Sequence, residues 1–448
     1  MSQMTQSAAP PQGDQTQLRK VLISSFFGST IEFYDFILYA TATATVFVPV
    51  FFSTLDPLLG MVASYLTFAA GYVSRPLGGL IFGHFGDKIG RKKMLMVSMT
   101  VMGVASVLIG LVPAVPVWGA FLLLTLRLVQ GIAIGGEWGG AALMSLEHAK
   151  GSRRGFAASF ANAGGPAGAF LGTAALALFA MLPEDQFLAW GWRVPFLFSV
   201  VLLVVGLYIR AQVAESPIFI AALKAAEEKK ALTRSTPIAK VLQRPRVLVV
   251  VGLVGMGAFV IQALFSTFGV TFAVGSGISR EVVLWAFAFS QLFAAFAIPA
   301  FAALSDRVGR RPVMLGGYVG MALLAFPLFW ALASGTTWMV FGVFLVALSL
   351  LQSMTFGPMA AFLAENFATT SRYTGASLGY QLAALLGAGF TPVIVASIFA
   401  ASGGEITGVI WFLIGGCVIS AVVLAVFTKE SRHVEIDETV TTARSSEH

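Results

Sequence analysis

The chain has 448 residues, of which 57% are hydrophobic and only 11% charged, and its mean hydropathy is +0.85. Soluble proteins usually carry about 25% charged residues, so the composition excludes an ordinary soluble protein. The single cysteine, Cys417, excludes a disulfide framework and a thiolate metal site.

After a polar tail at 1–20, long apolar stretches alternate with short polar loops. Stretches of about 20 apolar residues can cross a bilayer, and a spanning backbone must satisfy its own hydrogen bonds, as in a helix. We expect twelve such helices, over 21–50, 59–83, 94–112, 116–146, 156–182, 190–212, 247–274, 282–304, 313–334, 338–364, 374–400 and 406–428. The sequence therefore predicts an all-α membrane protein. Pro166 is compatible with either a kink or a helix end.

The charge pattern sets the expected topology. Of the 28 basic residues, 24 lie before the first stretch, in every second loop, or after the last stretch. Positive residues stay on the cytosolic side of a membrane, which explains the net charge of +7 without nucleic-acid binding. We expect a multi-pass protein of the cell membrane, functional as a monomer, with both termini in the cytosol.

One charged loop occurs twice. Asp306, Gly309 and Arg310 repeat Asp87, Gly90 and Arg91 at a spacing of 219 residues. The pairs Glu147 with Arg154 and Glu365 with Arg372 repeat at a spacing of 218. The chain therefore reads as two copies of one unit. We expect a six-helix half at 21–213, a cytosolic linker at 214–246, a second six-helix half at 247–428 and a polar tail at 429–448.

Charged residues inside the apolar stretches are confined to the first half. At about 100° per residue, Glu32, Asp35 and Tyr39 fall on one face of the first helix, within about 60°. Arg127, Gln130 and Glu137 fall within about 80° on the fourth. Charges inside a membrane are costly and usually functional.

Two carboxylates three residues apart repel one another, which makes Glu32 and Asp35 candidate proton carriers. Arg127 is always charged, so it can pair with a deprotonated carboxylate and release a protonated one. Glu137 is a further candidate for proton coupling. A static ion-pair network between the two helices remains the alternative.

Arg75, among Gly71, Gly78 and Gly79, is the candidate anion ligand, since an arginine fork suits a carboxylate. A structural arginine between helices is the alternative. The second half offers neutral polar groups instead, which suggests that it shapes the substrate pocket. The full set of candidate substrate ligands is Arg75, Arg127, Tyr39, Gln130, Gln262, Tyr380 and Gln381.

Enzyme and cofactor chemistry is not indicated. The four histidines lack metal-ligand spacing. There is no phosphate-binding loop and no nucleophile elbow. We expect a protein that is not an enzyme and that binds no metal or cofactor.

Several motifs resemble one family. The paired Asp-x-x-Gly-Arg loops and the segment from Arg127 to Gly136 resemble the major facilitator superfamily. Glu32-Phe-Tyr-Asp35-Phe, Arg75-Pro-Leu-Gly-Gly, the tryptophan-rich segment 190–196 and Arg372-Tyr-Thr-Gly375 resemble its metabolite:proton symporter family more narrowly. That family carries shikimate, α-ketoglutarate, citrate, other dicarboxylates, and proline or betaine.

The resemblance implies the major facilitator fold and alternating access, in which two six-helix halves rock about a site between them. It also implies a cytosolic gate that latches the outward-facing state. The implied gate residues are Gly83, Asp87, Gly90, Arg91, Glu147, Arg154, Asp306, Gly309, Arg310, Glu365 and Arg372. The chain departs from the family at Ala368, where proline is usual, and in lacking the coiled-coil tail of osmosensing betaine and proline carriers.

We expect a proton symporter that imports a small organic acid, with the lipid bilayer, the acid and the proton as its partners. A betaine or proline carrier and an exporter or antiporter of the same fold are the alternatives. A membrane enzyme or a receptor would need a site that the sequence does not contain.

Overall fold

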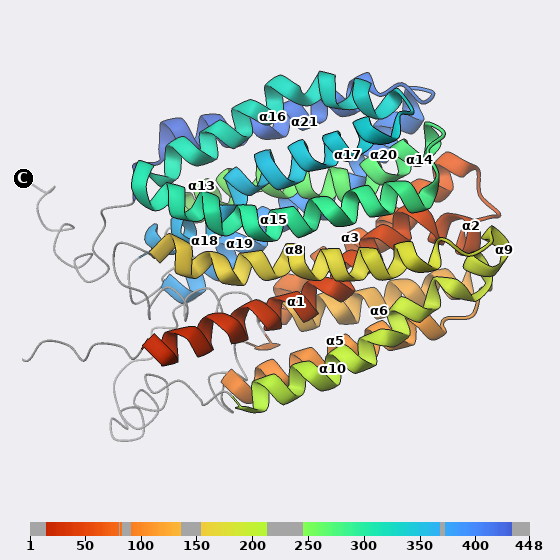
Figure 1. Cartoon of the computed structure of the whole chain (residues 1–448), viewed down its shortest axis with the longest axis horizontal. Helices are drawn as coiled ribbons and strands as arrows, with labels where there is room; N and C mark the ends of the chain where they lie inside the picture. Colours follow the sequence, from red (N-terminus) through yellow and green to blue (C-terminus); the bar gives the residue numbers. More distant parts are fainter. Residues whose placement is uncertain are drawn as a thin grey trace, which may run out of the picture.

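The computed structural model describes residues 15–79, 81–82, 91–135, 154–212, 245–367 and 372–431. Within these ranges the chain is helical and contains no strand. The long helices run side by side along one axis, as Figure 1 shows. Each of the twelve predicted apolar stretches overlaps a described helix, which confirms the predicted fold class.

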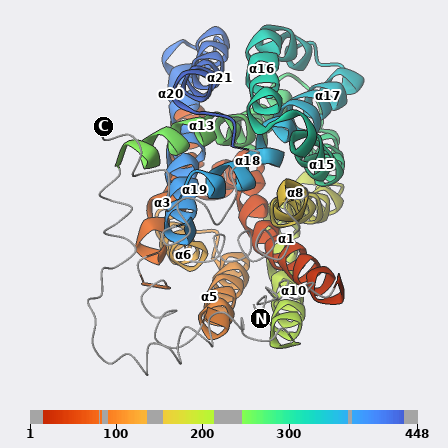
Figure 2. The same cartoon turned by 90° about the vertical axis from the view of Figure 1, so that its left-hand side faces the viewer.

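The helices up to residue 212 gather on one side of the bundle and those from residue 245 on the other (Figure 2). The first group is α1 (Gln15–Thr45), α2 (Phe47–Phe51), α3 (Pro57–Val73), α5 (Arg91–Leu111), α6 (Trp118–Ile134), α8 (Arg154–Phe179), α9 (Glu184–Gln186) and α10 (Arg193–Gln212). The second is α13 (Pro245–Leu264), α14 (Val270–Gly275), α15 (Arg280–Val308), α16 (Arg310–Ala333), α17 (Thr337–Phe344), α18 (Ser353–Glu365), α19 (Arg372–Ala384), α20 (Thr391–Ala401) and α21 (Thr407–Phe427).

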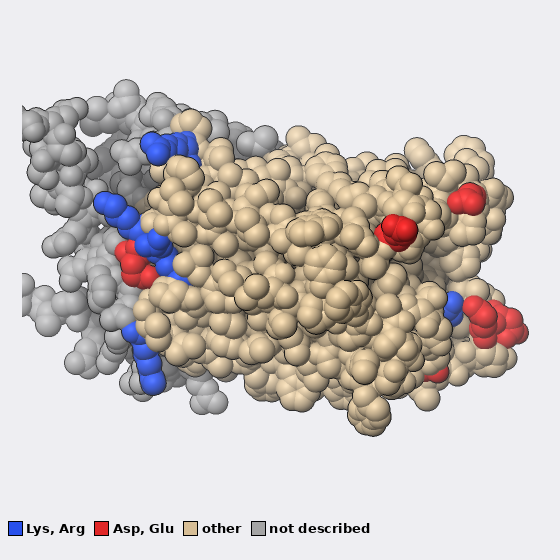
Figure 3. Space-filling model, turned by 90° about the horizontal axis from the view of Figure 1, so that it is seen from above, with Lys and Arg blue, Asp and Glu red and all other residues tan. Residues whose placement is uncertain are grey.

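The composition of the helices and of their surface fits a membrane. In the described part of the chain, eight helices are long and apolar enough to cross one, and two apolar helices are shorter. Large apolar side chains such as Trp338, Leu323 and Trp118 are more than two-thirds exposed. The side seen in Figure 3 is almost free of charge between its two ends. The protein is therefore a multi-pass membrane protein.

The two ends of the bundle differ in charge, as Figure 3 shows. We call the end where α1 begins and α21 ends the basic end; Arg307, Arg311 and Lys429 lie there. The opposite end is the acidic end. Its described acidic residues are Asp56, Glu184, Asp185, Glu281 and Glu405.

Small residues allow the helices to approach closely. A Cβ atom on Gly168 of α8 would lie 2.2 Å from the carbonyl oxygen of Thr30, so only glycine lets α8 rest on α1. α8 also packs against α15 and α18, and α3 packs against α20. These contacts join the two groups of helices.

Breaks in the helices cluster in the second group. π-helical turns interrupt the seventh, tenth and eleventh predicted stretches at Phe265–Gly269, Leu345–Gln352 and Leu385–Gly389. The sequence did not predict these turns, which are frequent near functional sites. Pro166 lies inside α8 rather than at a helix end. Residues 213–244 lie outside the described ranges, so the proposed linker and half boundaries remain predictions.

Candidate functional site

Two arginines are buried in the first half of the chain. Arg127 on α6 is 0% exposed, and Arg75, just after α3, is 4% exposed. They lie within electrostatic reach of one another. Two neighbouring buried cations repel each other and lose their hydration, so this arrangement favours an anion between or beside them.

Aromatic rings surround both guanidinium groups. The Arg127 guanidinium carbon lies 4.2 Å from the ring centroids of Phe36 and Tyr39, and that of Arg75 lies 4.2 Å from the centroid of Tyr72. Phe36 also faces Arg75, at 4.5 Å. The ring faces partly replace water around the cations.

Several of the buried N–H groups have no hydrogen-bond partner. They are Nε and Nη2 of Arg127 and Nε of Arg75. A buried donor without an acceptor costs about 1–3 kcal/mol, and more when it is charged. Unpaired groups of this kind require an explanation, and an anionic ligand would supply the acceptors.

The space for Arg127 depends on a glycine. A Cβ atom on Gly71 of α3 would lie 2.6 Å from Nε of Arg127. A Cβ on Gly131 of α6 would lie 2.1 Å from the carbonyl oxygen of Gly71. The glycines noted around Arg75 in the sequence therefore bring α3 and α6 together and leave room for the guanidinium.

The second half reaches this cluster through α19. Tyr380 lies within electrostatic reach of Arg75, Glu32 and Tyr72. Gln381 donates from Nε2 to the carbonyl oxygen of Gly135 (3.4 Å), while its Oε1 has no partner.

The other candidate substrate ligands fall both inside and outside the cluster. Tyr39 donates to Thr67 Oγ1 (2.8 Å) beneath the Arg127 guanidinium. Gln262 is half-buried on α13 and makes none of the described polar contacts with these residues.

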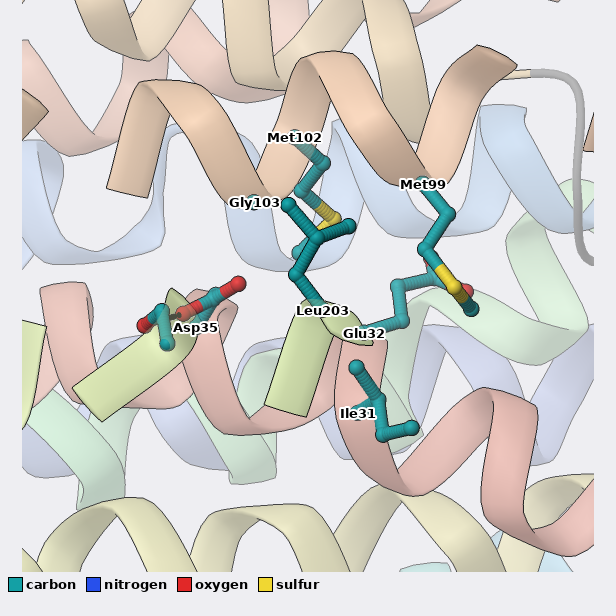
Figure 4. Close-up of a pocket in the computed structure, with 8 residues that line it drawn as sticks. Ile31, Glu32, Asp35, Met99, Met102, Gly103 and Leu203 are labelled. Atoms are coloured by element: carbon teal, nitrogen blue, oxygen red, sulfur yellow. Dashed lines mark hydrogen bonds between the residues drawn. The ribbon is translucent and has the colours of Figure 1, made fainter. Parts of the chain in front are cut away.

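Glu32 and Asp35, the two carboxylates of α1, lie at the same small pocket. This pocket lies between α1, α5 and α10, as shown in Figure 4. Met99, Met102 and Leu203 form its other walls. Asp35 accepts a hydrogen bond from Ser199 of α10, and Ser106 of α5 lies within interaction distance of the same side chain.

Asp35 and Arg127 are connected through two neutral side chains. Arg127 donates from Nη1 to Oε1 of Gln130 (3.1 Å), and Gln130 donates from Nε2 to Oγ of Ser106 (2.7 Å), which lies within interaction distance of Asp35. Arg127 and Asp35 are therefore not joined by a direct ion pair in this structure, and the expected pairing of Arg127 with a deprotonated carboxylate remains a prediction. Helical periodicity gives the face of one helix but not the hydroxyl that meets it, so the sequence analysis missed Ser106 and Ser199.

A charged network joins the halves at the basic end. Asp306 accepts from the backbone N–H groups of Gly155 and Phe156, both at 3.0 Å, and so caps the N-terminus of α8. Arg310 pairs with Asp306 (2.6 Å) and with Glu365 of α18 (3.2 Å). The predicted second-half gate residues Asp306, Arg310 and Glu365 therefore lie in one network.

The segment after α21 extends this network. The carboxylate of Glu430 accepts from the backbone N–H groups of Arg310 (2.9 Å) and Arg311 (3.1 Å). Ser431 donates to Glu365. Gly309 has φ of 117°, and a Cβ atom there would lie 2.7 Å from Glu430 Oε2, so the position requires glycine. The sequence analysis missed Glu430, which it assigned to the polar tail.

The halves also meet at the acidic end. Tyr65 of α3 shares a hydrogen bond with Thr271 of α14 (2.7 Å), and Thr271 donates to the carbonyl oxygen of Ala44 (3.1 Å). Glu184 pairs with Arg280 at 3.2 Å. The described halves are therefore in contact at both ends of the bundle, and the buried arginines lie between these contacts.

Some predicted site residues cannot be placed. Glu137, Gly83, Asp87, Gly90 and Glu147 lie outside the described residues. Arg91, Arg154 and Arg372 begin α5, α8 and α19, but their side chains are also outside the described set. No group of acidic, histidine or cysteine side chains in the described ranges could hold a metal ion.

Comparisons with known proteins agree on one family. The family model described as Major Facilitator Superfamily matches residues 25–376 and 262–445. The chain is 39% identical over 427 residues to the inner membrane metabolite transport protein YhjE of Escherichia coli, covering 92% of this chain and 94% of the relative. It is 37% identical over 434 residues to the shikimate transporter of Escherichia coli, covering 95% and 98%.

A more distant relative and a solved structure extend the comparison. The proline/betaine transporter of Escherichia coli is 32% identical over 396 residues, covering 86% of this chain and 78% of the relative. A partially occluded, inward-open structure of the xylose transporter XylE from Escherichia coli superposes with a TM-score of 0.74. That match covers 94% of this chain and 100% of XylE, at 20% identity, and it bears on the fold alone.

Proposed function

The chain belongs to the major facilitator superfamily, and from that premise we propose that it imports a small organic acid together with protons by alternating access. It is a transporter rather than an enzyme. The observation that carries the proposal is the pair of buried arginines, whose unpartnered N–H groups lie between two closed ends.

The substrate is a carboxylate. Nε and Nη2 of Arg127 form one edge of its guanidinium fork, and both lack an acceptor. The two oxygens of a carboxylate fit such an edge in a bidentate pair. Arg75 supplies a second cation, and Tyr380 and Gln381 supply groups for hydroxyls. A hydroxylated acid, of the kind named for the shikimate relative, suits these groups.

The proton is carried on the carboxylates of α1. Asp35 is 4% exposed and Glu32 is 7% exposed, so an added proton on either would remove a buried negative charge. A protonated Asp35 leaves Arg127 free to neutralise the substrate. Glu137 completes the proposed proton-coupling set. This balance of charge supports symport rather than exchange of the acid for a proton.

The gate at the basic end is the cytosolic gate. We assign the basic end to the cytosol because positive residues remain there, with both termini on that side. Asp306, Arg310 and Glu365 close it in the second half. Their first-half counterparts by repeat are Asp87, Arg91 and Glu147, and Gly83, Gly90, Gly309, Arg154 and Arg372 shape the same loops.

A zwitterion carrier for betaine or proline is the second candidate, since relatives of that kind are 31–32% identical. Such a substrate needs free aromatic faces for its cation. The described rings of Phe36, Tyr39 and Tyr72 already face arginine guanidinium groups. The carboxylate is therefore the better substrate for this site.

The test is uptake into proteoliposomes of shikimate, α-ketoglutarate, citrate, benzoate, proline and betaine, with and without an inward proton gradient. We expect one organic acid to accumulate only with the gradient. Arg75→Lys should lower its uptake by about tenfold, because the charge stays but the fork is lost. Glu405→Gln, an exposed change at the acidic end, is the control. Uptake indifferent to the gradient, or accumulation of betaine alone, contradicts the proposal.

A further inference from the structure

The link between Asp35 and Arg127 runs through Gln130 and Ser106. Arg127 and Gln130 each donate a hydrogen bond to the next residue toward Asp35. The Arg127 N–H donates to the Gln130 amide oxygen, and the Gln130 amide N–H donates to Ser106 Oγ. Ser106 also lies within interaction distance of Asp35, so its hydroxyl proton is available to that carboxylate. Arg127, Gln130 and Ser106 are each 0% exposed, so water does not interrupt the link.

We propose that Ser106 is a positioning residue that transmits the protonation of Asp35 to the Arg127 guanidinium, so that proton binding and acid binding are coupled through this relay. The inference rests on the proposed symport and adds the path by which the two sites communicate. Arg127 contacts the acid, whereas Ser106 acts only through Gln130 and Asp35.

The physical basis is the strength of hydrogen bonds to an ionised group. A bond to a carboxylate is roughly twice as strong as one between neutral groups, and linked bonds reinforce each other in a dry interior. Deprotonated Asp35 therefore holds the Ser106 proton and orients the Gln130 amide, whose oxygen anchors Nη1 of Arg127. Protonated Asp35 loosens each bond in turn, and the guanidinium is free to turn toward the acid.

The two serines that bond Asp35 differ in one respect. Ser106 connects onward to Gln130, whereas the only described polar contact of Ser199 is with Asp35. The titratable groups that face Asp35 are Glu32 and Tyr34 on its own helix and Arg127 on α6. On the packed helices, α5 and α10 present to it Ser106, Ser199 and the apolar pocket walls. Ser199→Ala is therefore the matched control.

The transport test compares gradient-driven accumulation with exchange in proteoliposomes. Shikimate is the first probe. If the wild-type protein does not accumulate shikimate, the probe is the acid of the panel that it does accumulate. We expect Ser106→Ala to lower gradient-driven accumulation by about tenfold or more while exchange of labelled for unlabelled acid at equal pH persists. Ser106→Thr, which keeps the hydroxyl, should restore accumulation. Ser199→Ala removes a bond to Asp35 but none to Gln130, so it should lower accumulation less than Ser106→Ala does. Equal losses in both alanine variants, or unchanged accumulation in Ser106→Ala, overturn the relay.

A second test needs no substrate. Infrared titration of the purified protein follows the Asp35 carboxyl, identified as the band lost in Asp35→Asn. Arg127→Lys keeps the charge but removes Nη1, so it should shift the titration midpoint in the wild-type and Ser199→Ala backgrounds and leave it unchanged in Ser106→Ala. An equal shift in all three backgrounds contradicts the relay. If wild type accumulates no acid, the proposed symport fails, and this titration still judges the relay on its own.

Discussion

At the scale of single residues, the site is defined by buried charge without full compensation. Arg127 keeps two unpartnered N–H groups although its Nη1 is bonded. A structural arginine in the same place would be expected to have these groups satisfied, as Arg193 does through the carbonyl oxygens of Gly110 and Val112. Arg310 also has an unpartnered Nε, but its Nη groups pair with two carboxylates, whereas no described carboxylate pairs with Arg127. This difference supports the proposal that Arg127 binds an anionic ligand.

Asp35→Asn tests the proton carrier. Asparagine mimics the protonated acid but cannot release a proton, so accumulation against a gradient should be lost while exchange at equal pH continues. Both modes are measured with the same labelled acid. Glu32→Gln is made in parallel, and the variant that loses accumulation identifies the carrier. Full accumulation in both variants would exclude α1 as the proton site.

Gly71→Ala tests the space for Arg127. The new Cβ would lie 2.6 Å from Nε, so the guanidinium must move away from its place over Phe36 and Tyr39. We expect the apparent affinity for the acid to fall by about tenfold with little change in thermal stability. Gly415→Ala on α21, where a Cβ meets nothing within 4 Å, is the control. Equal affinity in the two variants would show that Arg127 is not a ligand.

The sequence predicted the charged residues inside the helices and several of their large polar neighbours, but not the two serines beside Asp35 or Glu430. Asp35, Arg75 and Arg127 are conspicuous because charge inside an apolar stretch is rare. Ser106, Ser199 and Glu430 carry no such signal, since serine is common in membrane helices and Glu430 follows the last one. Their roles depend on which helix lies opposite, and only the tertiary structure supplies that.

At the scale of helices, the sequence predicted position and length well because the bilayer imposes both. It did not predict the π-helical turns at Phe265–Gly269, Leu345–Gln352 and Leu385–Gly389. Such a turn inserts one residue and shifts the phase of the residues after it. These helices are apolar on most faces, so the shift leaves little trace in the sequence. All three lie in helices that contact the first half or flank those that do.

Gly309→Ala tests the joint between α15 and α16. Alanine at φ of 117° is strained by about 1–3 kcal/mol, and its Cβ would displace Glu430. The basic-end network should loosen, and amide hydrogen exchange at residues 155–156, whose N–H groups Asp306 holds, should accelerate. Gly342→Ala in α17, which meets nothing within 4 Å, is the control. If amide hydrogen exchange at residues 155–156 is unchanged, Gly309 does not contribute to the gate.

At the scale of the whole molecule, the two closures are unequal. The basic end is held by buried ion pairs and backbone caps, whereas the pair Glu184–Arg280 at the acidic end is 72% exposed at Glu184. Exposed pairs contribute about 0.2–1 kcal/mol. The acidic end is therefore expected to open more readily.

Glu184→Arg tests this inequality. The reversal places like charges together and should favour opening at the acidic end by about twofold to fivefold. Opening is measured as maleimide labelling of Thr271→Cys, because the native Cys417 is buried. All variants are compared in that one background, since the substitution itself removes the hydroxyl that bonds Tyr65. The charge swap that adds Arg280→Glu should return labelling to its original rate. If neither change alters the labelling rate, the Glu184–Arg280 pair does not contribute to the gate.

The cap that Asp306 places on α8 has a consequence for the energy of the cell. A carrier that rocks while holding a proton but no cargo dissipates the membrane's proton gradient as heat. In the proposed orientation, opening the cytosolic side requires two backbone bonds to the Asp306 carboxylate to break, each contributing about 1.5–3 kcal/mol. An empty, protonated molecule has no substrate contacts to offset this cost, so it should seldom complete the turn inward. The network that links α8, α15 and α18 would thereby limit proton leak.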